Sequence, residues 1–130
     1  MRDIKTRRDL EFLLEKFYQT ATNDELIGGH FADLDLASHI PVITDFWVKT
    51  LFGEPVYFGN PFLTHQKLNE KAPLLTTHFK RWLEVFCTTV DMHFAGETAE
   101  KAKSKASFIS NSLDRQFNQD QAQIKTRPQS

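Results

Sequence analysis

The chain has 130 residues and a formal net charge of −1, from 16 basic and 17 acidic side chains. This length suffices for one domain with a substantial core. Nucleic acids and anionic membranes attract concentrated positive charge, so the balanced charge argues against both as partners. Cys87 is the only cysteine, which excludes an intramolecular disulfide and a four-thiolate metal site. With no signal-peptide core and no apolar run of bilayer length, we expect a cytoplasmic protein.

The first predicted helix covers residues 7–22, where apolar side chains recur at spacings of three and four. Thr6 is the expected N-cap, with Asp9 three residues further on. The glycine pair at 28–29 then predicts a turn before Phe31.

A second helix is expected over residues 36–52. Its apolar stripe starts at a histidine, and Pro41 is tolerable only near the first turn, so His39 should lie close to the N-terminus of this helix. The stripe consists of His39, Ile43, Phe46, Trp47, Thr50 and Leu51.

The segment VYFGNPFLTHQKL, residues 56–68, is unusually apolar for a stretch that glycine and proline mark as a loop. Loops normally run over the surface, so its aromatic side chains need something to pack against. The same segment delivers His65. We expect a loop followed by one or two helical turns within residues 63–70.

Two more helices complete the predicted all-α fold, because no segment alternates with a period of two. Pro73 and Leu74 should open a helix that ends near Phe94, and the last helix spans about 97–117. The expected inner face of the former is Leu75, Phe79, Trp82, Leu83, Phe86, Val90 and Phe94, and that of the latter is Ala99, Ala102, Ala106, Ile109, Leu113 and Phe117. We expect one domain over residues 1–117 and a polar, disordered tail over 118–130.

Common catalytic and metal-binding patterns are missing from the sequence. No two histidines have the i, i+4 spacing of a helical zinc site, and no Glu-x-x-His pair of a di-iron bundle occurs. There is no G-x-S-x-G elbow and no glycine-rich phosphate loop. Cys87 lies mid-helix, where thiols are usually inert.

Several polar groups nevertheless stand on apolar faces. A single Tyr, His or Trp on such a face is more often a core residue with a hydrogen-bond partner than a functional one. This applies to Tyr18, His39 and Trp82 when each is taken alone. Together with His65 they direct a phenol, an indole and two imidazoles toward one aromatic interior. A haem uses such a set: an imidazole on the iron, apolar walls and hydrogen-bond donors for a diatomic ligand. We therefore expect the apolar segment to pack against porphyrin and His65 to bind the iron, its other N–H donating to a backbone carbonyl.

The sequence resembles the group III truncated haemoglobins from about Leu10 to Leu113. The matching segments are FYQTATND at 17–24, HFADL at 30–34, HIPVITDFW at 39–47, YFGNPFLTHQKL at 57–68 and HFKRWLEVF at 78–86. The resemblance implies a truncated globin, a two-over-two helical sandwich around haem b.

The resemblance also implies roles for individual residues. His65 corresponds to the proximal iron ligand, Tyr18 and Trp82 to the distal donors, and His39 to the distal histidine. The expected haem-contacting residues are Phe31, His39, Ile43, Phe46, Trp47, Phe62, Leu68, Phe79 and Phe86. The candidates for contact with the haem propionates are Lys67, Arg81 and His78, whereas His30 and His93 are expected to be structural or exposed.

The function implied is reversible binding of oxygen or another diatomic ligand, including oxygen transport, rather than that of a dedicated enzyme. An unidentified reductase is the expected protein partner. One alternative is haem-dependent redox chemistry on bound nitric oxide or peroxide. The other is a cofactor-free helical interaction domain in which the aromatic residues are only core.

Overall fold

The computed structural model describes residues 1–119, and it contains helices and no strand over that range, which confirms the all-α class. The elements are α1 (Arg7–Ala21), the 3-10 helix η1 (Gly28–Phe31), α2 (Leu36–Phe52), α3 (Pro61–Lys71), α4 (Thr76–His93), α5 (Glu97–Asp114) and the π-helical turn η2 (Arg115–Gln119). The tail predicted from Asn118 onward lies, after its first two residues, outside the described range. No helix within residues 1–119 has the length and apolar character needed to cross a bilayer.

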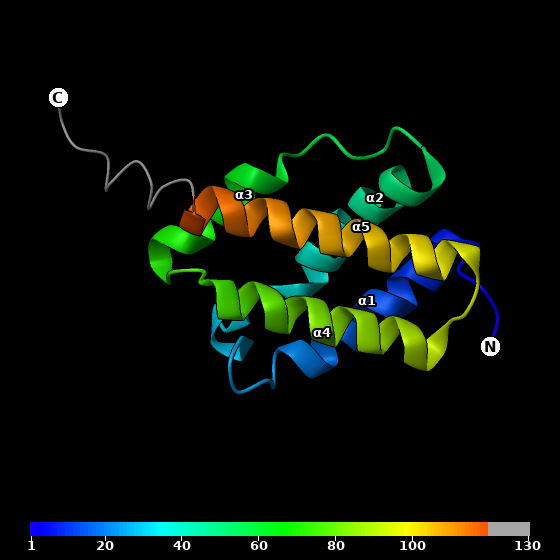
Figure 1. Ribbon diagram of the computed structural model, residues 1–130. Helices are drawn as coiled ribbons and strands as arrows, with labels where there is room; N and C mark the ends of the chain where they lie inside the picture. The colour runs from blue at the N-terminus through cyan, green and yellow to red at the C-terminus, as the bar shows by residue number, and fades with distance from the viewer. Residues whose placement is uncertain (120–130) are drawn as a thin grey trace, which may run out of the picture.

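The four long helices form two layers. Helices α4 and α5 lie side by side and antiparallel, and α1 and α2 cross behind them (Figure 1). The main core fills the space between the layers, with Phe17 of α1, Val48 of α2 and Phe86 of α4 each about 1% exposed. Helix α3 lies at one end of this arrangement, beside the last turns of α5 (Figure 1).

The predicted start of α1 is confirmed. The Thr6 side chain accepts from the Asp9 amide at 3.2 Å, and the Asp9 carboxylate accepts from the Thr6 amide at 3.0 Å. This reciprocal capping box satisfies backbone donors that the first helical turn leaves without partners. Asp9 is buried, and its carboxylate also pairs with Arg2.

The start of α5 is capped from the opposite end of the chain. The Asp3 carboxylate accepts from the amides of Thr98 and Ala99, each at 2.8 Å. Gly96, which precedes the helix, has a φ of +145°, a conformation that glycine adopts readily. The N-terminal arm therefore closes the turn between α4 and α5.

Helix α3 is longer than predicted. It starts at Pro61, and the Asn60 side chain accepts from the amides of Phe62 and Leu63 at 3.0 and 3.3 Å. The glycine and proline of this segment indicate a loop, but Asn60 is a strong N-cap and proline suits the first helical position, where no amide partner is needed. The helical turns predicted within residues 63–70 are therefore part of a longer helix, and His65 stands inside it.

One prediction of burial was wrong, and one aromatic side chain stands in solvent. Phe58, in the segment expected to pack against porphyrin, is 90% exposed. Leu75 is 50% exposed and is the N-cap of α4, while the adjacent Leu74 is buried at 7%. The helix expected to open at Pro73 starts only at Thr76. The first residue of its predicted inner face therefore lies before the helix and does not face the core.

Candidate functional site

The described residues enclose one large cavity of about 510 Å³, lined by residues of all five α-helices and of η1. This volume is in the range typical of sites for organic ligands and cofactors. The lining is mainly aromatic and aliphatic, with a few polar groups placed among them. Such a cavity favours a largely apolar occupant whose orientation is set by a small number of polar contacts.

Eight of the nine predicted haem-contacting residues line this cavity, namely Phe31, His39, Ile43, Phe46, Trp47, Leu68, Phe79 and Phe86. The ninth, Phe62, stacks on Phe117 with ring centroids 5.3 Å apart and belongs to a separate cluster. The reason is helical periodicity, because α3 presents residues 61, 64, 65 and 68 to the cavity. Phe62 lies on another face of that helix.

His65 is held in one tautomer by its own helix. Its Nδ1–H donates to the backbone oxygen of Pro61, one turn earlier, at 2.6 Å. Since the carbonyl can only accept, Nδ1 carries the proton and Nε2 keeps a lone pair. Burial lowers the pKa of His65, an effect that the hydrogen bond to Pro61 partly offsets, so the neutral imidazole is favoured. The ring is thus an oriented nitrogen ligand in an apolar cavity.

Tyr18 and His39 meet across the space between α1 and α2. The Tyr18 hydroxyl lies 2.8 Å from Nε2 of His39. Burial raises the pKa of Tyr18, so the phenol keeps its proton and is the donor in this bond. Desolvation, and then the neighbouring charge of His65, lower the pKa of His39, which favours the neutral imidazole as acceptor.

Trp82 is fixed by aromatic packing. Its ring stacks on Phe86 at 5.5 Å with an interplanar angle of 12°, and Phe86 in turn stacks on Trp47 at 5.0 Å and 15°. The edge of Phe17 contacts both Trp82 and Phe86, at 5.9 and 6.0 Å. These contacts leave the indole little freedom to turn, so its N–H has a defined direction at the cavity wall.

Comparison with known proteins agrees with this arrangement. No protein-family profile matches the chain. Over 105 residues the chain is 27% identical to the group 3 truncated hemoglobin ctb of Campylobacter jejuni, in a match that covers 76% of this chain and 80% of that relative. The crystal structure of a group III truncated hemoglobin from Campylobacter jejuni aligns with a TM-score of 0.79 at 23% identity, over 90% of this chain and 95% of the other.

The fold is that of a truncated globin. The resemblance to the group III truncated haemoglobins is confirmed, and so is the predicted two-over-two sandwich.

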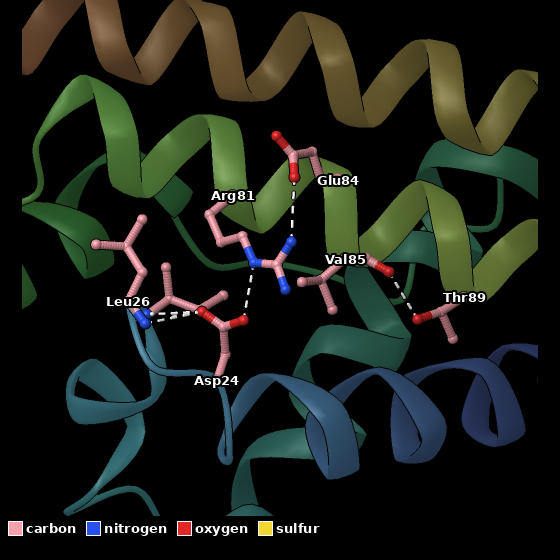
Figure 2. Close-up of polar contacts among 7 residues, drawn as sticks. Asp24, Leu26, Arg81, Glu84, Val85 and Thr89 are labelled. Carbon is pink, nitrogen blue, oxygen red and sulfur yellow. Dashed lines mark hydrogen bonds and ion pairs between the residues drawn. The ribbon is translucent and has the colours of Figure 1, made fainter.

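In this globin fold, two of the three residues considered for propionate contact lie outside the cavity lining. Figure 2 shows Arg81 bound to Asp24 through Nε at 2.8 Å and to Glu84 at 3.1 Å. Asp24 also accepts from the amides of Leu26 and Ile27, so Arg81 anchors the loop after α1. Lys67 is exposed and does not line the cavity either.

The third candidate, His78, lines the cavity together with His30, which was expected to be structural or exposed. The two ring centroids are 4.6 Å apart with an interplanar angle of 66°. Both residues begin segments that carry the family resemblance, HFADL and HFKRWLEVF. No spacing rule links them, because they come from η1 and α4 and meet only in the folded chain.

Proposed function

We propose that this chain binds haem b in the cavity, with His65 as the proximal ligand of the iron, and that it reversibly binds oxygen or another diatomic ligand. The observation that carries the proposal is the fixed tautomer of His65. Its Nδ1–H is bound to Pro61 at 2.6 Å, and its Nε2 lone pair belongs to a ring that lines an apolar cavity. A backbone bond of this kind orients metal-binding histidines and raises their basicity.

The remaining lining supports a flat, apolar occupant. The rings of Trp47, Phe86 and Trp82 stack in succession and all line the cavity, and Phe79 and Leu68 add further apolar surface to it. Burying apolar surface against these side chains stabilises a porphyrin by the hydrophobic effect, at about 25 cal/mol per Å² removed from water. The chain thus supplies both a ligand and walls.

Bound haem supplies an iron coordination position for a diatomic ligand. The protein contributes two donors, Tyr18 O–H and Trp82 N–H, each on a ring that packing already holds. Donors fixed in advance lose little conformational entropy when they bind a ligand. His39 accepts from Tyr18 at 2.8 Å, so a change in its rotamer would release the phenol toward the cavity or withdraw it.

A second candidate function is redox chemistry on nitric oxide or peroxide, with an unidentified reductase as partner. The observation that favours it is the same Tyr18–His39 bond, because a phenol joined to a partly exposed imidazole can pass a proton between cavity and solvent. The proposal includes a cytoplasmic location and a use in oxygen transport. A single cysteine without a disulfide partner suits a reducing compartment.

A visible absorption spectrum tests the proposal. Purified from cells supplied with haem, the protein should show a Soret band and contain about one haem per chain, since one cavity holds one proximal ligand. A colourless protein that also fails to take up added hemin would refute it. The cofactor-free interaction domain would then be the better interpretation.

A further inference from the structure

The cavity offers few groups to a negatively charged occupant. Among the described residues its lining contains no lysine or arginine, and its only basic side chains are the imidazoles of His30, His39, His65 and His78. His39 already accepts from Tyr18. In the proposed function His65 binds iron. Of the basic side chains in the lining, only His30 and His78 remain to meet an anionic group.

Existing hydrogen bonds fix which nitrogens of this pair are used. The amide of Leu75 donates to Nδ1 of His78 at 2.9 Å, so the proton of the neutral His78 ring is on Nε2. Nε2 of His30 lies 3.2 Å from the backbone oxygen of Pro73 and must be the donor. Within residues 1–119 no hydrogen bond uses Nε2 of His78 or Nδ1 of His30. Each ring therefore keeps one nitrogen for a further partner.

The charges around the pair also favour an anion. The rings are 4.6 Å apart, and a second positive charge at that distance is unfavourable without a counter-ion. The nearby guanidinium of Arg81 is neutralised by Asp24 and Glu84. The one carboxylate in the cavity lining is that of Asp35, and it already accepts hydrogen bonds from the first turn of α2.

We propose that His30 and His78 form the carboxylate subsite of the cavity and donate hydrogen bonds to a propionate of the bound haem. The inference rests on the proposed function and adds to it a specific anchor for one edge of the cofactor. His78 donates through Nε2. His30 donates through Nδ1 in its imidazolium form, with Nε2 still bound to the backbone oxygen of Pro73.

The test compares the affinity of the protein for hemin and for hemin dimethyl ester, which has the same porphyrin without the negative charges. The variant is H78E, and T77E is its matched control. Glu at the third helical position still accepts from the N-cap amide, so the start of α4 is preserved. T77E adds the same charge on an exposed neighbour that does not line the cavity. A second variant, H30F, keeps an aromatic ring against residue 78.

The wild type and T77E should prefer hemin over the ester by about tenfold or more, the usual value of hydrogen bonds to a charged group. In H78E this ratio should fall to about one or below, and in H30F, which keeps the His78 donor, it should fall to a value between that of H78E and that of the wild type. An unchanged ratio in both variants, with hemin still bound, would overturn the subsite and leave the proposed function intact. A ratio that falls in a third variant, K67Q, and in neither H78E nor H30F would assign the carboxylate to the exposed Lys67 and would equally overturn the subsite. Failure of the wild type to bind either porphyrin would refute the proposed function and the subsite together.

Discussion

The two walls of the cavity are built in different ways. Helix α4 buries Phe79, Val85, Phe86, Thr89 and Val90 against the other long helices. Helix α3, which carries His65, has no buried residue, and the segment before it leaves Phe58 90% exposed. The proposed donors Tyr18 and Trp82 therefore stand on packed helices, whereas the proposed iron ligand stands on a helix that packs little against the protein.

This difference indicates which part of the site is ordered by the protein alone and which part depends on the occupant of the cavity. The wall formed by α1 and α4 is stable through side-chain packing alone, and its donors are placed before any ligand arrives. Helix α3 has its N-cap and its local hydrogen bonds but little tertiary burial, and short helices are marginal without it. Its order in the protein should depend on what fills the cavity.

The largest effect is expected from H65G, which removes the proposed iron ligand on α3. Haem affinity should fall by more than about 100-fold, because loss of even an outer partner of a metal ligand costs 10- to 100-fold. Added imidazole should enter the space and restore a spectrum close to that of the wild type. Optical titration with hemin, with and without imidazole, measures both effects.

The matched control for H65G is T64G. Thr64 is its neighbour on α3 and also lines the cavity, so both variants carry the same helix-weakening glycine. T64G should keep the spectrum and most of the affinity. An unchanged ferrous spectrum in H65G would show that another histidine is the proximal ligand.

Removal of haem should loosen α3 while leaving α1 and α4 ordered. With free hemin at about 100 times its dissociation constant, binding stabilises the occupied state by about 2.7 kcal/mol, or roughly 100-fold in an opening equilibrium. Amide hydrogen exchange of α3 should therefore accelerate by about this factor in the apoprotein. The core amides around Phe86 should stay protected. Equal acceleration in α1, α3 and α4 would contradict the division between the two walls.

Y18F and W82F test the preformed wall. Each should speed oxygen release by roughly 10- to 150-fold, the loss of one hydrogen bond of about 1.5–3 kcal/mol to a ligand that gains negative charge on binding. Release of carbon monoxide, which stays nearly neutral, should change much less. Stopped-flow ligand replacement gives both rates.

Tyr57, the only other tyrosine, supplies the control for Y18F. It lines the cavity but packs on Phe46 at 5.4 Å, away from the Tyr18–His39 bond. Y57F removes the same hydroxyl and should leave oxygen release within about twofold, as expected for a site outside the donor network. Unchanged oxygen release in Y18F, W82F and their double variant would refute the donor roles.

The smallest expected effect is the dependence of apoprotein stability on pH. Burial lowers the pKa of His39, His65 and His78 in the folded chain below the ordinary value of 6.5. As the pH falls below about 6.5, the unfolded chain therefore binds more protons than the folded chain. The contribution of these histidines to the free energy of unfolding is fully present above that pH and is lost as the pH falls further. Each histidine contributes at most about 1.4 kcal/mol per pH unit to the slope. Urea midpoints at pH 8 and 5.5 should differ in this direction, and H78Q should reduce the difference.

Local sequence signals predicted the helices well where caps and periodicity agreed. Thr6 and Asp9 fix the start of α1 through contacts three residues apart, which a sequence displays directly. The start of α3 was missed because Asn60 and Pro61 favour a turn and a helix start equally. Phe62, which the resemblance placed among the haem contacts, is turned toward Phe117 by the helix.

The sequence by itself determined the all-α class, the helix count of the main layers and the apolar stripes that face the core, because these depend on residues a few positions apart. It also marked Tyr18, His39, His65 and Trp82 as polar groups on apolar faces. Only the tertiary structure decided that Tyr18 binds His39 across 21 positions and that Asp3 caps α5 across the chain. The meeting of His30 with His78 was likewise settled by helix packing, because contacts between distant segments leave no periodic trace in the sequence.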